Sequence, residues 1–391
     1  MKVFIIAGEP SGDRLGGALM AGLKALNPEV QFDGIGGAEM QAQGLVSRFP
    51  MDELSVMGIA EILPKYRALM ARINETAQAV IETAPDVMIT IDSPDFSLRV
   101  ARRVKAACDI RTVHYVAPTV WVWRPKRAQK MAKVIDHVLA LFPFEPPLMT
   151  LDGMVCDFVG HPVVAEPQAT EAEALAFREA KGIGSAPLLL VLPGSRRGEV
   201  ERLGDIFGKA IAPVLDRHPD LKVVVPAAGP VADVVLEKVR GWPAAPIVLD
   251  PRDMNVDAAR RIKRAAFRAA DVALAASGTV SLELAAARTP MVIAYKMNWI
   301  SFNIIKAMAL VDTVTLVNLV SDTRVVPDFL GPDCTPEKIG AGILDVMAAP
   351  EAQQAAMEVT MQRLGEGGED PGLRAALAVL SRLPSKGQAD A

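Results

Sequence analysis

The sequence predicts an α/β protein with two domains, each a parallel sheet covered by helices, that face each other across a cleft. The chain has 391 residues, too many for one ordinary core and suitable for two domains of about 150–200 residues. Short apolar runs alternate with longer amphipathic stretches, as in parallel sheets that carry helices on both faces. One pattern, an apolar strand followed by a glycine turn and a helix, occurs twice, at residues 2–13 and 188–199.

The first half of the chain alternates between strand and helix patterns. The expected strands are residues 2–7, 30–35, 86–91, 111–116, 137–141 and 155–159. The expected helices are residues 15–26, 66–83 and 96–107. Residues 166–173 are polar and contain a proline, which predicts a linker and an N-terminal domain over residues 1–168.

The second half repeats the alternation. The expected strands are residues 188–192, 221–226, 247–250, 271–275 and 290–294. The expected helices are residues 199–215, 258–269, 280–287 and 337–347. Residues 352–383 read as helical throughout, and the last eight residues fray. We expect a second domain over residues 169–350 and C-terminal helices over residues 351–391. Packing of these helices on the N-terminal domain is one possible arrangement.

Composition narrows the class of function. A net charge of −4 argues against a general nucleic-acid binder. Three scattered cysteines and four histidines form no disulfide framework or zinc spacing, so we expect neither a metal site nor a cofactor. The chain starts in a strand pattern, and no uncharged apolar run reaches about 18 residues, so we expect a cytoplasmic protein.

The two glycine turns indicate anion binding without the common nucleotide motifs. A strand that ends in such a turn and opens a helix gathers free backbone N–H groups at one point. The sequence contains no G-x-G-x-x-G, no P-loop and no D-x-D. An enzyme that uses a sugar nucleotide would then neutralise the diphosphate with arginine and a helix N-terminus.

The segment Ser277-Gly278-Thr279 follows the expected strand 271–275 and predicts one wall of a nucleotide site. Its hydroxyls and N–H groups converge where the next helix begins. Glu283 lies one helical turn further on the same face, where a carboxylate can accept both hydroxyls of a ribose. The alternative is an ordinary capped helix with an exposed glutamate.

Arg196 strengthens the nucleotide interpretation. It follows Gly194-Ser195 at the carboxyl end of the second domain's first strand, the edge at which open parallel sheets bind ligands. One guanidinium there can hold two phosphate oxygens. Arg197 is the weaker candidate and can simply face water.

Asp92 is the candidate general base. It ends the expected strand 86–91, which brings a carboxylate to the cleft, where it can take a proton from an attacking hydroxyl. A plain turn aspartate is the alternative. Asp95 is expected to be the N-cap of the next helix.

The remaining candidates lie in the first domain. Glu9 and Ser11 line the first glycine turn, and Asp13 can instead favour its own helix N-terminus. Residues 114–127 place tryptophans beside a basic cluster, either as a phosphate- and lipid-facing wall or as a packed tryptophan beside a solvated helix. Residues 56–63 are apolar apart from Glu61 and precede Lys65 and Arg67, which suits a helix at a membrane interface or a core-facing helix.

Several segments together resemble the lipid-A-disaccharide synthase family. They occur in the family's order over about residues 1–330: Gly8-Glu-Pro-Ser-Gly-Asp13, Val56-Met-Gly58, Ile91-Asp-Ser-Pro-Asp-Phe96, His114-Tyr-Val-Ala-Pro-Thr-Val-Trp-Val-Trp-Arg124, Phe142-Pro-Phe-Glu145, Gly160-His-Pro162, Leu192-Pro-Gly-Ser-Arg196 and Ala276-Ser-Gly-Thr279 with Glu283. The set is specific, although no single motif is. A longer, more basic stretch at residues 252–268 departs from the family pattern.

The resemblance implies an inverting glycosyltransferase with two Rossmann-like domains, the GT-B type. The implied reaction joins UDP-2,3-diacylglucosamine to 2,3-diacylglucosamine 1-phosphate and releases UDP and a β-1,6-linked disaccharide 1-phosphate. The implied location is peripheral, at the inner face of the inner membrane. The oligomeric state stays open, a homodimer included.

The resemblance also assigns residues to roles. Asp92 matches the proposed catalytic base. The donor UDP side is matched by Ser195, Arg196, Ser277, Gly278, Thr279, Glu283 and Asn318. The acceptor side comprises Glu9, Ser11 and His114. The membrane- and acyl-facing region comprises Val56, Met57, Ile59, Ile62, Leu63 and Leu69.

Two other classes remain as alternatives. One is a different UDP-sugar enzyme of similar fold, such as a UDP-N-acetylglucosamine 2-epimerase or the peptidoglycan glucosaminyltransferase. The other is a two-lobed sugar-nucleotide-binding protein without catalysis. Only the disaccharide synthase would release UDP from a mixture of the two acylated glucosamines and form a disaccharide.

Overall fold

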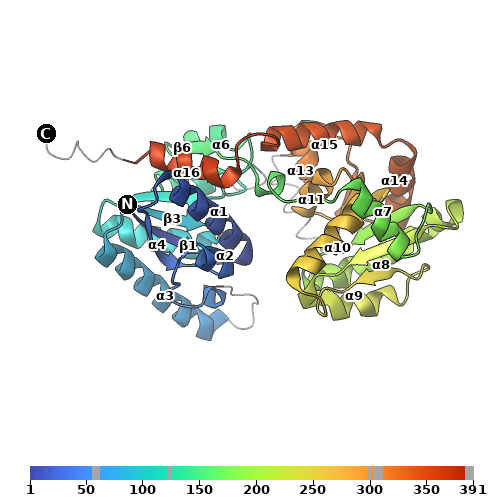
Figure 1. The fold of residues 1–391 in the computed structure, drawn as a ribbon, viewed down its shortest axis with the longest axis horizontal. Helices are drawn as coiled ribbons and strands as arrows, with labels where there is room; N and C mark the ends of the chain where they lie inside the picture. The colour runs from blue at the N-terminus through green and yellow to red at the C-terminus, as the bar shows by residue number, and fades with distance from the viewer. Residues whose placement is uncertain (55–61, 122–125, 298–301, 303–310, 384–391) are drawn as a thin grey trace. The chain divides into compact units, whose positions relative to one another are not determined.

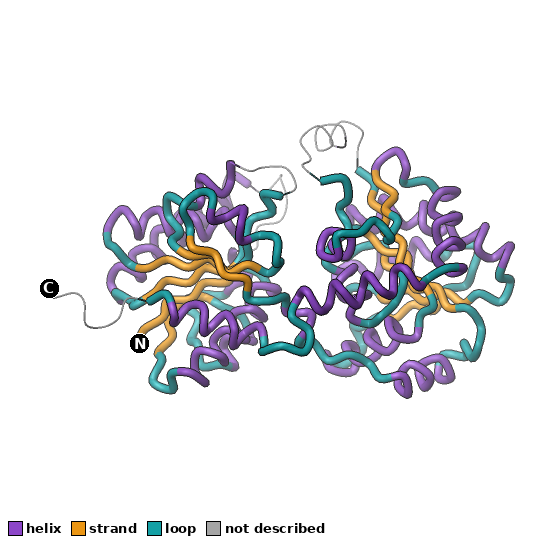
Figure 2. Tube along the Cα trace, turned by 90° about the horizontal axis from the view of Figure 1, so that it is seen from above, coloured by secondary structure: helices purple, strands orange, loops and turns teal. Residues whose placement is uncertain are grey.

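The computed structural model describes residues 1–391 except 55–61, 122–125, 298–301, 303–310 and 384–391 (Figure 1); for residues 62–65 and 126 it describes the backbone alone. The chain divides into two compact units, Met1–Ala165 with Leu364–Ala391, and Glu166–Arg363. Within each unit a sheet is flanked by helices on both sides (Figure 2). The predicted fold class, two parallel-sheet α/β domains, is confirmed at the level of the two units.

The first unit contains a six-stranded parallel sheet in the order β2-β1-β3-β4-β5-β6. Its strands are β1 (Lys2–Ala7), β2 (Gln31–Ile35), β3 (Val87–Ile91), β4 (Arg111–Tyr115), β5 (His137–Ala140) and β6 (Val155–Phe158). Each bound lies within one residue of its prediction. The central strands β1 and β3 are buried almost throughout, as expected of strands covered on both faces.

The first unit also contains helices and short 3₁₀ turns. They are α1 (Pro10–Leu26), α2 (Ala38–Ala42), η1 (Met51–Leu54), α3 (Ile62–Thr83), α4 (Pro94–Ala107), α5 (Lys126–Met131), α6 (Pro146–Thr150), η3 (Pro162–Val164) and α16 (Pro371–Ser381). Helix α1 begins five residues before the predicted position 15. Pro10 suits a first helical position because it needs no N–H partner there.

The second unit contains another six-stranded parallel sheet, in the order β12-β11-β10-β7-β8-β9. Its strands are β7 (Leu188–Leu192), β8 (Lys222–Pro226), β9 (Ile247–Leu249), β10 (Val272–Ala276), β11 (Met291–Tyr295) and β12 (Asp328–Leu330). Strand β12 was not predicted, because its three residues include the charged Asp328 and lie between Pro327 and Gly331. It pairs with β11 at the sheet edge.

The second unit's helices pack on this sheet around a core of valine, leucine, isoleucine and phenylalanine side chains. They are α7 (Glu171–Ala180), α8 (Arg197–Arg217), η4 (Gly229–Val231), α9 (Ala232–Val239), α10 (Val256–Ala269), α11 (Val280–Ala286), α13 (Leu316–Ser321), η5 (Gly331–Asp333), α14 (Pro336–Ala348) and α15 (Glu351–Leu364).

The predicted linker over residues 166–173 is too long. Helix α7 already begins at Glu171, because Thr170 and Glu173 form a capping box. The Thr170 hydroxyl accepts a hydrogen bond from the Glu173 N–H at 3.2 Å, and the Glu173 carboxylate accepts one from the Thr170 N–H at 2.8 Å.

The C-terminal stretch is two helices rather than the one continuous pattern that the sequence suggested. Gly365 and Gly367 have φ angles of 107° and 76°, which few other residues adopt, and they end α15. Helix α15 up to Arg363 belongs to the second unit, whereas α16 packs beside α1 in the first (Figure 1). Residues 351–391, which the sequence interpretation grouped together, are thus divided between the units.

The strand orders place a topological switch point in each sheet. In the first unit, the chain leaves β1 for β2 on one side and continues from β3 on the other. In the second unit the same reversal occurs between β7 and β10. Neighbouring strand ends diverge at such a point, and ligands of open α/β sheets bind there.

Candidate active site

A cavity of about 470 Å³ lies at the switch point of the second unit. The turns after β7 and β10, together with helix α11, contribute six of the seven residues predicted for the donor: Ser195, Arg196, Ser277, Gly278, Thr279 and Glu283. Pro226 to Ala228 after β8 and Lys263 of α10 complete much of the wall. The pairing of β7 with β10 therefore brings together two segments whose paired residues, such as Leu192 and Ala275, are 83 positions apart in the sequence.

The turn after β7 differs from its prediction. The carboxylate of Glu199 accepts hydrogen bonds from the N–H groups of Ser195 at 3.1 Å and Arg196 at 3.3 Å. The expectation that these N–H groups are free for a ligand is therefore wrong. Gly194, with a φ of 124°, permits this close turn, since a Cβ there would lie 2.6 Å from the Glu199 Cβ.

Arg196 supplies the positive charge at this turn instead. Its side chain is 71% exposed, and its Nη1 lies 3.6 Å from Glu199 Oε1. Arg197 does not line the cavity and is bound to Glu201 at 2.7 Å. The two neighbouring arginines therefore differ in their surroundings.

The turn after β10 is open. Gly278 has a φ of 156°, and a Cβ there would meet nothing within 4 Å. Thr279 is the N-cap of α11, but its side chain makes no capping hydrogen bond, so the predicted hydroxyl cap is not formed. Glu283 lies one turn into α11, and its Oε2 is 2.5 Å from Lys263 Nζ.

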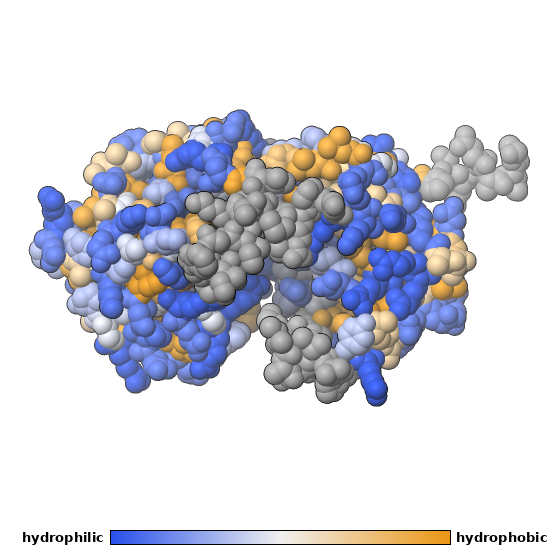
Figure 3. All heavy atoms as spheres, turned by 180° about the vertical axis from the view of Figure 1, so that it is seen from behind, coloured by the Kyte–Doolittle hydropathy of each residue, from blue (hydrophilic) through white to orange (hydrophobic). Residues whose placement is uncertain are grey.

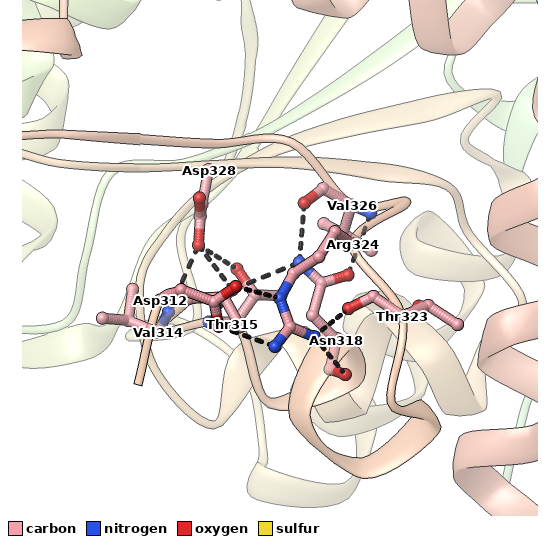
Figure 4. Close-up of polar contacts among 9 residues, drawn as sticks. Asp312, Val314, Thr315, Asn318, Thr323, Arg324, Val326 and Asp328 are labelled. Carbon is pink, nitrogen blue, oxygen red and sulfur yellow. Dashed lines mark hydrogen bonds and ion pairs between the residues drawn. The ribbon is translucent and has the colours of Figure 1, made fainter. Parts of the chain in front are cut away.

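Asn318, the seventh predicted donor residue, does not line this cavity. It is 1% exposed, and its amide joins the two ends of a loop (Figure 4). Its Nδ2 donates to the Thr313 hydroxyl at 3.2 Å and to the Val326 carbonyl at 2.8 Å, while its Oδ1 accepts from the Val326 N–H at 3.0 Å. These hydrogen bonds occupy the Asn318 amide, so a direct contact between Asn318 and the UDP-sugar stays a prediction.

The loop around Asn318 is braced by two further interactions in Figure 4. Arg324 holds Asp312 through Nε at 2.8 Å and Nη2 at 2.6 Å. Asp328, the first residue of β12, accepts from the Thr313 hydroxyl at 2.6 Å. These contacts fix the segment that leads into the edge strand.

Asp92 lies at the switch point of the first unit, directly after β3. Asp92 and Ser93 have left-handed φ angles of 50° and 43°, and Val116, which follows the paired strand β4, has a φ of 82°. Such angles cost non-glycine residues about 1–3 kcal/mol each and cluster at functional sites. No feature of the sequence signalled this strain.

Hydrogen bonds hold Asp92 in this conformation. Its N–H donates to the Tyr115 carbonyl at 3.0 Å, and its carbonyl accepts from the Ser97 hydroxyl at 2.8 Å. The side chain is half-buried. Ser93 is the N-cap of α4, so the prediction that Asp95 caps this helix is wrong; Asp95 lies exposed in the first turn.

The predicted acceptor residues of the first glycine turn are exposed, and Asp13 is not. Glu9 is the N-cap of α1, and Ser11 lies in its first turn. Asp13 is 4% exposed, and its carboxylate accepts from the N–H groups of Gly37, Glu39 and Met40 at 2.7, 2.9 and 3.1 Å. It therefore stabilises the N-terminus of α2, a different helix from the one considered in the sequence analysis.

His114, the third predicted acceptor residue, lies inside the sheet at 1% exposure. Its Nδ1 is 2.7 Å from the hydroxyl of Thr90 on β3. Burial lowers the pKa of His114 to about 4, so the ring is neutral at physiological pH.

The tryptophan segment after β4 belongs in part to an aromatic cluster. Trp121 packs edge-on against Phe142 and Phe144, and its Nε1 donates to Glu145 at 3.4 Å. Glu145 is 2% exposed, and burial raises its pKa to about 7. Trp123 lies outside the described residues, so the packed alternative holds for Trp121 alone.

Most of the predicted membrane-facing side chains lie outside the part of the chain that the structure describes. Val56, Met57 and Ile59 lie outside the described residues, and the side chains of Ile62 and Leu63 are not described. Leu69 is half-buried on α3. On the face drawn in Figure 3, hydrophilic side chains cover most of the described surface, with apolar ones scattered between them. None of the described helices is both long and apolar enough to cross a bilayer.

Within the described parts of the chain, no three histidine, cysteine, aspartate or glutamate side chains are grouped so as to hold a metal ion. Charged residues of the cavity are Arg196, Lys263, Glu199 and Glu283. Lys263 and Glu199 were not predicted. Glu199 carries a local signal, since it stands three residues after the helix N-cap and reaches back to it; Lys263 carries none.

Two solved structures share this architecture. A UDP-GlcNAc 2-epimerase from Neisseria meningitidis bound to UDP-GlcNAc matches with a TM-score of 0.64 over 97% of this chain and 99% of that chain, at 12% identity. MurG from Acinetobacter baumannii matches with a TM-score of 0.54 over 97% of this chain and 98% of that chain, at 14% identity. At such low identity these matches show the fold alone.

Sequence comparison shows the family. The model of the family described as lipid-A-disaccharide synthetase matches residues 3–374. The lipid-A-disaccharide synthase of Ruegeria pomeroyi is 67% identical over 384 residues, which are 98% of this chain and 96% of that protein. The enzyme of the same name from Rhodospirillum centenum is 45% identical over 396 residues, 100% of this chain and 96% of that protein. The chain therefore belongs to the lipid-A-disaccharide synthase family of glycosyltransferases.

Proposed function

We propose that the protein joins UDP-2,3-diacylglucosamine to 2,3-diacylglucosamine 1-phosphate, releasing UDP and a β-1,6-linked disaccharide 1-phosphate. The observation that carries the donor half is the cavity in which Ser195, Arg196, Ser277 to Thr279 and Glu283 meet. The family supplies the acyl sugars. The acceptor half is placed on the first unit, around Asp92.

In this proposal the chemistry is a single displacement. The 6-hydroxyl oxygen of the acceptor attacks the anomeric carbon of the donor, and Asp92 takes the hydroxyl proton. The bond from that carbon to the phosphate oxygen breaks, and its electron pair leaves with UDP. Attack opposite the leaving group inverts the anomeric configuration.

Departing UDP gains negative charge, and the cavity offers cationic and polar groups to stabilise it. Arg196 can take two phosphate oxygens as a fork, and the hydroxyls of Ser277 and Thr279 can donate beside it. Glu283 can accept from the ribose hydroxyls. The strained backbone at Asp92 and Ser93 supports a functional role for the carboxylate, because strain of this kind persists where function requires it.

The Asp92→Asn variant tests the base. We expect disaccharide formation to fall about 10²–10⁴-fold, because the amide cannot accept the hydroxyl proton, while UDP binds as in the wild type. The measurement is UDP release and disaccharide yield from the two acylated glucosamines, with calorimetric UDP binding alongside.

Asp95→Asn is the matched control, since Asp95 is an exposed carboxylate three residues away on the same turn. It should retain full transfer. Full transfer by Asp92→Asn would refute the assignment of the base, and failure of the wild type to form disaccharide would refute the proposed reaction.

We also propose that the protein docks on the inner face of the inner membrane through residues 56–70. Both substrates carry acyl chains, and removing each CH₂ group from a bilayer costs about 0.8 kcal/mol. In the described part of this region, Tyr66 is 46% exposed and Arg67 is also exposed, an aromatic and a cationic side chain that suit an interface.

Vesicle sedimentation tests this docking. We expect binding to vesicles with anionic lipid at low salt, weaker binding at high salt, and less binding for Arg67→Ser. Arg240→Ser, which removes an exposed arginine from the second unit, is the control. Indifference of the wild type to anionic vesicles at low salt would rule out the interface role.

A further inference from the structure

Lys263 forms an ion pair inside the candidate donor cavity. Its Nζ lies 2.5 Å from Glu283 Oε2, and both side chains line the cavity. Lys263 comes from the basic stretch at residues 252–268. The pair thus joins Glu283, which was predicted to contact the ligand, to Lys263, which was not.

The fold holds the two side chains opposite each other. Helix α10 begins where the Asn255 side chain accepts from the Ala258 N–H at 2.8 Å. Near the other end of α10, the Thr289 hydroxyl donates to the Phe267 carbonyl at 2.6 Å, and Arg268 Nη1 donates to the Ala287 carbonyl at 3.2 Å. Thr289 and Ala287 directly follow α11, so these bonds tie the helix of Lys263 to the helix of Glu283.

The ring of Phe267 restricts Lys263 further. Phe267 lies one helical turn after Lys263 on α10. The Lys263 ammonium lies 5.1 Å from the centroid of the Phe267 ring, within the range of a cation–π contact. Lys263 therefore has the ring on one side and the Glu283 carboxylate on another.

The charges of the cavity show why such a pair matters. Each acid on its wall lies beside a cation: Glu199 is 3.6 Å from Arg196, and Glu283 is 2.5 Å from Lys263. Without Lys263, Glu283 would present an unpaired carboxylate to a diphosphate that occupied the same cavity, and like charges at a few ångströms repel.

We propose that Lys263 is a positioning residue of the donor site, which acts through Glu283: it offsets the charge of that carboxylate so that the cavity accepts a nucleoside diphosphate. This inference rests on the proposed donor role of the cavity. The inference gives the basic stretch at residues 252–268 a function in ligand selection, because Lys263 lets the cavity bind a phosphorylated nucleoside next to the Glu283 carboxylate.

A double-mutant cycle with two ligands tests the inference. Calorimetry would give the dissociation constants of UDP and of uridine, which has the ribose but no phosphate, for the wild type, Lys263→Met, Glu283→Gln and the double variant. We expect Lys263→Met to weaken UDP binding roughly three- to tenfold, with a larger effect at low salt, and to change uridine binding less. In the Glu283→Gln background the same change should have little effect, since no carboxylate is left to offset.

Lys238→Met is the matched control, because Lys238 forms an ion pair with Asp205 at 2.8 Å outside the cavity. It should leave UDP binding unchanged. An equal loss of UDP and uridine binding, an unchanged UDP affinity in Lys263→Met, or an equal loss in both Glu283 backgrounds would overturn the inference. Failure of the wild type to bind UDP would instead overturn the proposed function.

Discussion

Arg196 and Arg197 illustrate how neighbouring residues of one type acquire different roles. Arg196 lines the cavity with a side chain that is 71% exposed and only loosely paired. Arg197 does not line the cavity, and its side chain is bound to Glu201 at 2.7 Å. A guanidinium that faces a cavity can bind phosphate oxygens in pairs, whereas an exposed pair on a helix contributes about 0.3–0.5 kcal/mol to stability.

The arginine pair therefore offers a sharp comparison. We expect Arg196→Ala to weaken UDP binding at least tenfold, about 1.5–3 kcal/mol for a charge-assisted hydrogen bond, and to lower the transfer rate. Arg197→Ala should change neither by more than about twofold, because its ion pair is exposed. UDP calorimetry and the transfer assay measure the effects of both substitutions. Equal effects of Arg196→Ala and Arg197→Ala would contradict the placement of the diphosphate beside Arg196.

Helices α1 and α16 cross at two glycines. A Cβ at Gly22 would lie 2.6 Å from the Gly372 carbonyl oxygen, and a Cβ at Gly372 would lie 2.6 Å from the carbonyl oxygen of Ala18. Backbone atoms cannot yield as a flexible side chain can. The absence of side chains at these positions lets the C-terminal helix lie directly against the first helix (Figure 1).

Gly22→Ala should therefore destabilise the protein, although alanine is the better helix former. We expect the free energy of unfolding to fall by about 1–3 kcal/mol, because the methyl group overpacks a backbone crossing. Gly198→Ala in α8 is the control: its nearest neighbour would be the Arg202 guanidinium at 3.5 Å, so this change should be neutral or slightly stabilising. Chemical denaturation of both variants measures the difference, and a stabilising Gly22→Ala would contradict the crossing.

Buried titratable groups determine how the stability of the whole molecule depends on pH. Burial lowers the pKa values of His114, His137 and His161 to about 4. Their contribution is complete above the unfolded value of about 6.5 and is lost as pH falls towards 4. Burial raises the pKa of Glu145 to about 7, so its contribution is complete below about 4.3 and is lost as pH rises through 7.

As pH rises from about 4.3 to 6.5, the three histidines raise the free energy of unfolding and Glu145 lowers it, so the effect of Glu145 is seen against a variant that lacks this carboxyl group. Glu145→Gln mimics the protonated carboxyl group, so relative to this variant the wild type should lose about 2–3 kcal/mol between pH 5 and pH 8. Unfolding free energies at several pH values measure this loss. Glu29→Gln, at an exposed position, should show no such trend; a difference between wild type and Glu145→Gln that is independent of pH would contradict the assignment.

Local sequence sufficed for much of this protein. Eleven strands were predicted within about one residue because apolar runs covered on both faces stand out, and the turns at residues 194–196 and 277–279 were predicted from glycine and hydroxyl residues beside them. Strand β12, the start of α7 and the division between α15 and α16 were missed or misplaced, since these depend on a very short run, a capping box and two glycine angles.

The candidate sites themselves depend on contacts between distant residues. The pairings of β1 with β3 and of β7 with β10 create the two switch points. Each pairing consists of hydrogen bonds between strands about 80 residues apart in the sequence. The left-handed backbone at Asp92, the burial of Asp13 against α2 and the pair of Lys263 with Glu283 are likewise features of the tertiary structure. The sequence by itself determined which segments carry the chemistry, because turn and strand preferences are local. Only the tertiary structure decided which of these segments meet, because strand order and helix packing are set by interactions that no local pattern contains.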